Sequence, residues 1–389
     1  MQRMSSLDCL KGLAMVIMAL DHTRLYLHAD SYIFDPVDLD ETTIAIFFTR
    51  YITHICAPIF ILLAGVSSYL VQKKLPDNKA LSIWLLKRGA SLIFLEFTLV
   101  NFAWYFDVKT DYLLLGILWA IGASMLMMAP AVLLPRKLLL VASVIILAGH
   151  NLLDGIEPES MNFFTLTWFL LHLTGEEFLG GFGLFNTYPL LPTFGILLLG
   201  YSIGPILQWS EQDRIRLLGI AGILMLLTFV ILRTFTEYGD YWPWEEYDTY
   251  VQTWMSFIDV NKSPPSLLYA LVTLGITALF WAWIEAKKPM HLTQVLSVYG
   301  RVPMFYYIVH LYVIHLVALL LAGWEPHYSM QDMIINEWMD EDPALKGFGY
   351  SLPVVYGVTV AIVAGLYPVC RWYHTFKRNH PNNVVLRYV

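Results

Sequence analysis

Long apolar segments, repeated along the whole chain, constrain this sequence more than any other feature. A helix needs about 20 mainly apolar residues to cross a bilayer. The segments show no strict alternation of apolar and polar residues, so they predict helices rather than strands. The predicted spans are 9–27, 44–72, 81–105, 112–134, 138–154, 188–208, 217–235, 265–285, 303–323 and 350–373.

The composition excludes the main soluble classes. Hydrophobic residues make up 57% of the 389 residues and charged residues 14%, against about 25% charged in typical soluble domains. Such a chain is too apolar for a soluble monomer or a disordered protein. Its net charge of −7, without a basic stripe, argues against nucleic-acid binding. The three cysteines form no CxxC motif. The sequence therefore predicts an all-α, polytopic membrane bundle of about ten spans, folded as a single domain over residues 1–389.

The basic residues predict the orientation of this bundle. Placing both termini in the cytoplasm leaves Lys109, Lys262 and Lys346 and little else that is basic in the outer loops. The basic residues on the inner side are then Arg3, Lys73, Lys74, Lys79, Arg136, Lys137, Arg214, Arg216, Lys287, Lys288, Lys377, Arg378 and Arg387. The apolar segment 161–174 is too short to span, and we expect it to be re-entrant or interfacial.

Ionisable residues inside predicted spans are costly, so each is a candidate functional residue. The first span carries Asp21, His22 and Arg24 near its predicted outer end, with His28 just beyond. Asp21 and Arg24 are three residues apart, and Arg24 and His28 are four apart. One helix face can therefore hold a carboxylate, a guanidinium and an imidazole together.

The second span adds another basic pair. Arg50 and His54 share a helix face, and Pro58 predicts a kink because it frees the carbonyl of His54. In a structural interpretation, Arg50 pairs with Asp21 and His54 bonds to a carbonyl. In a functional interpretation, the histidines of the first two spans converge. Histidine beside carboxylates is suited to general-base or nucleophilic chemistry, because its pKa lies near working pH.

Polar residues elsewhere in the spans are sparser. Histidine spacing predicts no metal site, and the sequence contains no P-loop, GxGxxG or GxSxG motif. We therefore expect no metal cofactor. The remaining polar residues of interest are Lys87, Arg88, Glu96, Asn101, His150, Asn151, Asp154, His310 and His315.

Two motifs resemble a known family. SLDCLKGLAMVIMALDH is similar to the LDxxRG opening of integral-membrane acyltransferases, with Lys11 in place of the usual arginine. THICAPIFILLAGVSSYL resembles the second helix of bacterial proteins grouped with the heparan-alpha-glucosaminide N-acetyltransferase catalytic domain. Further similarities, such as LAGHNLLD, GRVPMFYYIVHLYVIH and YPVCRWYHTFKR, extend the resemblance over nearly the full length.

The resemblance implies transfer of an acyl group, most simply acetyl, across the inner membrane. The donor would be cytosolic acetyl-CoA, and the acceptor a sugar or glycan-type molecule on the outer side. The family assigns the key role to a histidine near the outer end of the first helix region, for which His22, His28 and His54 compete here. Asp21 would orient that imidazole.

The same interpretation assigns roles to two further sets of residues. Arg50, Arg24 or Asn101 would stabilise the oxyanion. Basic residues at the inner side, Lys11, Lys87, Arg88 and Arg301, would contact the phosphates of CoA.

Other interpretations remain open at this stage. A proton-coupled transporter or flippase would use the same intramembrane histidine, aspartate and arginine groups. A non-catalytic scaffold fits less well, since it has little need for ionisable groups in lipid. Gly195, Gly200 and Gly204 offer a small-residue face on which a second copy could pack as a homodimer.

Overall fold

The computed structural model describes residues 5–108, 111–156, 162–287, 290–335, 343–383 and 386. Within them the chain is mostly helical and divides into two compact units. Unit 1 comprises residues 1–56, 98–112 and 289–389, and unit 2 comprises residues 57–97 and 113–288. The elements α3, η3 and β1 each contain residues from both sides of this division. Arg3, Lys109, Lys288 and Arg387, used above to predict the orientation, lie outside the described residues.

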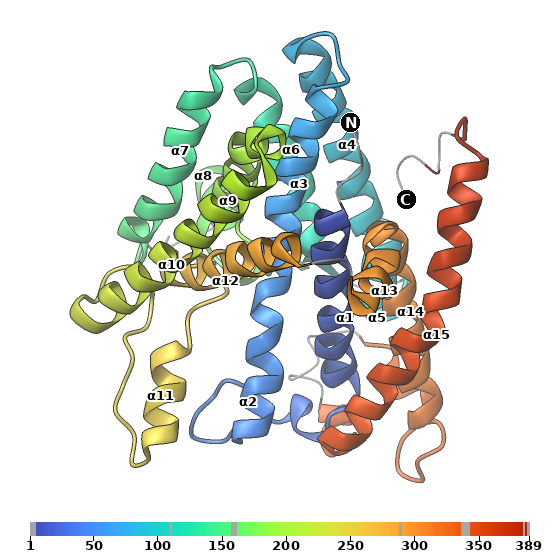
Figure 1. Ribbon diagram of the computed structural model, residues 1–389. Helices are drawn as coiled ribbons and strands as arrows, with labels where there is room; N and C mark the ends of the chain where they lie inside the picture. Colours follow the sequence, from blue (N-terminus) through green and yellow to red (C-terminus); the bar gives the residue numbers. More distant parts are fainter. Residues whose placement is uncertain are drawn as a thin grey trace. The chain divides into compact units, whose positions relative to one another are not determined.

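Unit 1 is built around the first helix of the chain. Helix α1 packs against α13, α14 and α15, which follow one another near the C-terminus (Figure 1). The elements of unit 1 are α1 (Ser5–Leu27), η1 (Ala29–Tyr32), α2 (Ile44–Tyr51), η2 (Ile52–Ile55), α5 (Asn101–Tyr105), α13 (His291–Gly300), α14 (Pro303–Ala322), η6 (Met330–Met333), η7 (Pro343–Leu345) and α15 (Leu352–Asn379).

Two glycines permit the close approach of α1 and α13. A Cβ atom added at Gly12 would overlap the carbonyl oxygen of Leu296, and one added at Gly300 would overlap that of Asp8. Backbone therefore packs directly on backbone at this crossing, as small residues allow in membrane helices. This contact fixes the first half of α1 within unit 1.

Unit 2 is a set of paired helices with a small sheet. Helix α10 packs along α12 (Figure 1), α4 packs on α6, and α9 packs on both α6 and α7. Its elements are α3 (Cys56–Gln72), α4 (Asn78–Leu95), the π-helical η3 (Glu96–Val100), β1 (Tyr112–Leu115), α6 (Ile117–Ala131), α7 (Arg136–Gly149), η4 (His150–Leu153), α8 (Phe163–His172), β2 (Gly175–Leu179), β3 (Phe182–Asn186), α9 (Leu190–Ile203), η5 (Gly204–Gln208), α10 (Glu211–Phe235), α11 (Tyr250–Ile258) and α12 (Leu267–Ala286).

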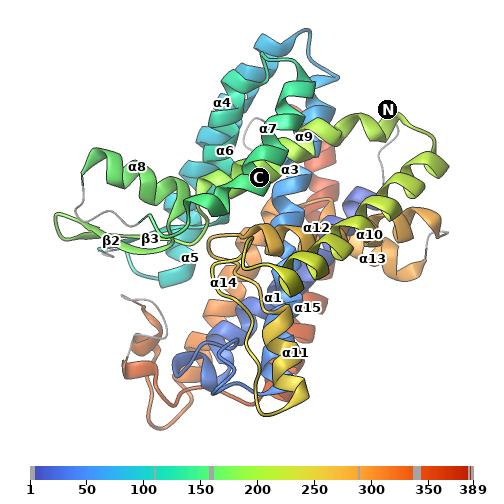
Figure 2. The same ribbon diagram turned by 90° about the vertical axis from the view of Figure 1, so that its left-hand side faces the viewer.

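The small sheet was not predicted from the sequence. It has the strand order β1-β3-β2, and β2 and β3 form an antiparallel hairpin in which Leu179 pairs with Phe182 (Figure 2). The two-residue turn is Gly180–Gly181, and both glycines have positive φ. This is the conformation that a tight hairpin turn requires and that glycine adopts without strain.

In the described part of the chain, helices that are long and apolar enough to cross a membrane account for seven of the ten predicted spans. They are Ile44–Gln72, Arg136–Leu153, Leu190–Gln208, Glu211–Phe235, Leu267–Ala286, Pro303–Ala322 and Leu352–Asn379.

The other three predicted spans are largely helical, but each departs from a simple apolar helix, and residues 112–115 of the predicted span 112–134 form the strand β1 instead. Helix α1 contains Asp8, Lys11, Asp21 and Arg24, α4 carries several basic residues, and α6 is short, with 15 residues. The count of ten and the orientation of the termini therefore stay predictions. Helix α8, within the segment 161–174, has only 10 residues and is about half the length of a span.

The predicted dimer face is used inside unit 2. A Cβ atom at Gly200 would overlap the Leu62 carbonyl, and one at Gly204 would overlap the ring of Tyr69. Gly195 faces Ile146 and Leu147 on α7. The three glycines serve intramolecular packing, so a homodimer would have to use another surface.

Candidate functional site

The second half of α1 carries the charged group of unit 1. The Asp21 carboxylate accepts a hydrogen bond from Arg50 Nη1 at 2.8 Å and one from Arg24 Nη2 at 3.4 Å. Arg24 is buried, whereas the side chains of Asp21 and Arg50 are 16% and 20% exposed. Both pairings predicted for Asp21 are therefore confirmed: one follows the helical repeat, and the other joins α1 to α2.

The chain after Arg50 changes its helical geometry. Helix α2 gives way to the 3₁₀ turn η2 (Ile52–Ile55), which contains His54 and ends three residues before Pro58. A proline-induced distortion is the ordinary cause of such a break. His54 is buried, and its ring packs against that of Tyr51 with centroids 5.3 Å apart.

A pair of histidines lies beside this group. His22 Nδ1 is 2.9 Å from His310 Nε2, and His310 Nδ1 is 2.9 Å from the carbonyl oxygen of Tyr306. The carbonyl can only accept, so His310 Nδ1 must donate, and the Nε2 of neutral His310 must accept from His22 Nδ1–H. Neutral His22 then carries its basic lone pair on Nε2.

Packing supports that arrangement. His310 is fully buried, and its ring stacks on His22 with centroids 5.0 Å apart. Trp104 of α5 meets the His22 ring edge-on at 4.9 Å. His22 is only partly buried. The orientation of its ring is thus fixed by α14 and α5.

His28 has a different environment. It is buried, caps η1 by accepting from the backbone N–H of Asp30 at 3.3 Å, and forms a backbone bridge with Tyr350. Burial lowers the pKa of His28, and the Asp30 carboxylate opposes this only in part. His28 is therefore neutral at pH 7 and acts as a cap. Asn101 is buried at the start of α5, directly after the π-helical turn η3.

The predicted phosphate-binding residues fall into two pairs. Lys11 precedes Gly12 and Arg301 follows Gly300, so the α1–α13 crossing brings their backbones close together in unit 1. Lys87 and Arg88 belong to α4 in unit 2, and Arg88 directly precedes Gly89, which packs on Gly122 of α6. Lys87 and Arg301 are exposed.

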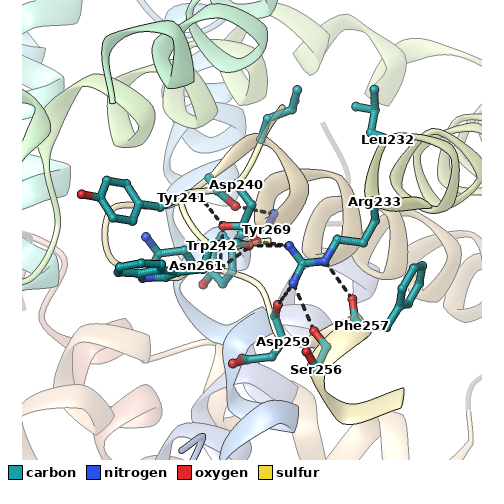
Figure 3. A network of polar contacts seen from close by, with 12 residues as sticks. Leu232, Arg233, Asp240, Tyr241, Trp242, Ser256, Phe257, Asp259, Asn261 and Tyr269 are labelled. Carbon is teal, nitrogen blue, oxygen red and sulfur yellow. Dashed lines mark hydrogen bonds and ion pairs between the residues drawn. The ribbon is translucent and has the colours of Figure 1, made fainter. Parts of the chain in front are cut away.

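Unit 2 contains a buried arginine that sequence analysis missed. Arg233, at the end of α10, is 4% exposed and pairs with Asp240 at 3.1 Å (Figure 3). Its guanidinium also donates to the backbone carbonyls of Trp242, Ser256, Phe257 and Asp259. These contacts hold the segment between α10 and α12 in place. The sequence did contain a signal for Arg233, because it is a basic residue in the last turn of a long apolar helix.

A second histidine group lies in unit 2. His150, Asp154 and His172 each offer one potential ligand atom within 4.8 Å of the other two. Asp154 and His172 line a cavity of about 260 Å³, together with Tyr241, Trp242 and others. Sequence analysis noted His150 and Asp154 but not His172, which follows Asp154 by 18 residues.

Comparison with known families decides the relationship. The family model described as heparan-alpha-glucosaminide N-acetyltransferase, catalytic, matches residues 3–236. That range is more than half of the 389 residues. The chain belongs to this family. A search of curated proteins found no match.

The matched range contains some of the residues described above and excludes others. It includes Asp21, His22 and Arg50, and also the histidine group of unit 2. It ends before Asp240 and before His310, the residue that orients His22. The family and the long apolar helices make the chain a membrane protein of the transferase kind.

Proposed function

We propose that this protein transfers an acyl group across the inner membrane. The donor is cytosolic acyl-CoA, with acetyl-CoA the first candidate, and the acceptor is a sugar or glycan-type molecule on the outer side. The family supports the reaction class, and seven long apolar helices support the membrane setting. The two termini then lie in the cytoplasm, following the basic residues of the loops.

The observation that carries the proposed chemistry is the hydrogen-bonded chain from His22 through His310 to the Tyr306 carbonyl. This chain leaves the basic lone pair of neutral His22 on Nε2, and we assign the general-base role to that atom. His22 takes a proton from the acceptor hydroxyl or amine as that group attacks the thioester carbonyl. The bond between carbonyl carbon and sulfur breaks, and His22 returns the proton to the departing CoA thiolate.

The charged residues beside His22 have a separate role in the proposal. Asp21 holds the guanidinium groups of Arg24 and Arg50 by direct ion pairs. Arg50 is the more exposed of the two arginines, so it is the better placed to stabilise the negative oxygen of the tetrahedral intermediate. Asn101 is a second candidate donor. In this arrangement His310, rather than Asp21, orients the imidazole.

Binding of CoA phosphates is assigned to the basic pairs. Lys11 and Arg301 lie close along the backbone at the α1–α13 crossing, and two neighbouring cations favour a phosphate. Lys87 and Arg88 form the second pair, on α4.

A transporter or flippase remains the alternative function. The same intramembrane groups, the ion-paired set Arg50–Asp21–Arg24 and the hydrogen-bonded pair His22–His310, also suit a proton relay. The two functions differ in one respect: a transferase binds acyl-CoA and releases free CoA, whereas a proton-coupled transporter does neither.

The experiment begins with acetyl-CoA binding to the purified full-length protein in detergent, measured by calorimetry. We expect saturable binding that weakens in Arg88→Ala. In liposomes with acyl-CoA inside and sugar acceptors outside, free CoA then appears together with acylated acceptor. Folded protein that binds neither acetyl-CoA nor longer acyl-CoAs contradicts the proposal, and proton-coupled flux through the same liposomes would establish the alternative.

A further inference from the structure

Three potential metal ligands meet in unit 2 where α7 ends and α8 ends. His150 begins the turn η4, Asp154 follows that turn, and His172 is the last residue of α8. His172 Nε2 lies 3.0 Å from Asp154 Oδ1. The rings of the two histidines meet edge to face with centroids 5.9 Å apart. Both histidines are 2% exposed.

Three of the four ring nitrogens of this group lack a protein partner among the described residues. Among the residues that the structure describes, neither nitrogen of His150 and not Nδ1 of His172 makes a hydrogen bond, although all three atoms are buried. Buried polar atoms in native proteins are almost always satisfied. Each neutral imidazole carries one lone pair, so each of the two rings, beside a carboxylate, can donate an electron pair to a bound ion.

The surroundings hold the carboxylate in place and leave room for an open position. Asn151 Nδ2 donates to Asp154 Oδ2 at 2.7 Å, while Asn151 Oδ1 accepts from the backbone N–H of Leu267 at 2.9 Å. Hydrogen bonds of this kind orient metal-binding carboxylates. Asp154 and His172 also form part of the wall of the cavity of about 260 Å³, which can admit water or a small molecule.

We propose that His150, Asp154 and His172 bind one divalent transition-metal ion, with zinc the first candidate. Two imidazoles and a carboxylate are a ligand set that zinc favours, and a fourth position is left for water. Ligand atoms around tetrahedral zinc lie about 3.3 Å apart, so the side chains close slightly as the ion enters. In the metal-free form neutral His172 donates its Nε2–H to Asp154, which leaves its lone pair on Nδ1. An ion bound at Nε2 instead requires that proton to move to Nδ1, so the ring loses no net proton.

This inference departs from the sequence-based expectation of no metal. That expectation considered His150 without His172, and two ligands on one turn do not define a site. The inference is independent of the acyl-transfer proposal, because the test below measures the metal itself and not turnover.

The test is zinc binding to the full-length protein in detergent after treatment with a chelator. Calorimetry gives the stoichiometry and the affinity. We expect one zinc ion per chain and a higher melting temperature when zinc is present. His150→Ala and His172→Ala should each weaken binding at least tenfold. His291→Ala, which removes an exposed histidine of unit 1, should not.

Asp154→Asn is a variant that should fold normally, so a loss of zinc binding in it cannot be caused by misfolding. Asparagine keeps the shape and can still accept from His172, but it loses the charge that binds the cation. The melting temperature without zinc shows that each variant is folded. The inference is overturned if folded wild-type protein takes up no zinc, or if the three variants bind it as tightly as His291→Ala.

Discussion

The two histidine groups of this protein are built in opposite ways. In unit 1, His22 and His310 form a continuous chain of hydrogen bonds that ends on a backbone carbonyl. In unit 2, His150 and His172 are both buried, yet three of their four ring nitrogens have no hydrogen-bond partner in the described part of the chain. The first group has a defined tautomer. The second has unassigned nitrogens, which the proposed metal ion would partly satisfy.

The difference teaches how to interpret a buried histidine. A ring whose nitrogens are all assigned is either a structural link or a positioned base. His315 shows the structural case, since its two nitrogens face the carbonyls of Ala103 and Met333 and tie α14 to its neighbours. A ring with unassigned buried nitrogens carries an energetic cost that a bound ion can remove.

The largest expected effect tests the first group. His22→Ala should lower turnover about 10²–10⁴-fold, the usual contribution of a general base, without changing acyl-CoA affinity. His310→Gln should give a smaller loss together with an altered pH profile, because it acts only by orienting His22. Initial rates of CoA release in liposomes, measured over a range of pH, check both.

The control for this prediction is His327→Ala, an exposed histidine of the same unit, which should keep wild-type rates. Equal turnover in His22→Ala and wild type would show that His22 is not the general base and that its hydrogen bond to His310 is structural. In that case His54 becomes the next candidate.

The two aspartate–arginine pairs extend the comparison to stability. Arg233 and Asp240 are each 4% exposed, whereas Arg50 and Asp21 are 20% and 16% exposed. Arg233→Met removes the ion-pair partner of a buried carboxylate and the donor to several carbonyls, which typically costs about 3–5 kcal/mol. Arg50→Met should cost about 1 kcal/mol, because water reaches that pair. Thermal unfolding in detergent measures both, and equal losses would contradict the role assigned to burial.

The sequence was sufficient for most of the helices. The predicted span 303–323 is observed as Pro303–Ala322, because an apolar run bounded by polar residues defines its own ends. The β2–β3 hairpin was missed although Gly180–Gly181 marks its turn. The hairpin lies between the short apolar segment 161–174 and the predicted span 188–208, and no secondary structure was predicted for it.

The contacts of the candidate site were predictable only where the two residues are close in sequence or carry opposite charges. The Asp21–Arg24 pair follows from the helical repeat, and Arg50–Asp21 from the need to neutralise charge in lipid. The partner of His22 lies 288 residues away. No spacing rule connects such residues, since the packing of α1 against α14 brings them together.

The smallest expected effect concerns the pH dependence of the buried pair in unit 2. Burial raises the pKa of Asp240 from 3.8 to about 6, although Arg233 favours the carboxylate. Between these two values the folded state keeps a proton that the unfolded chain has released, so Asp240 stabilises the fold at low pH and this contribution is lost as pH rises through about 6. The stability difference between wild type and Asp240→Asn should therefore fall by about 1 kcal/mol from pH 5 to pH 7. Unfolding in detergent at the two pH values measures it, with the exposed Asp248→Asn as the control. A difference that does not change with pH would mean that Arg233 outweighs burial, and the contrast between the two aspartate–arginine pairs would then rest on geometry alone.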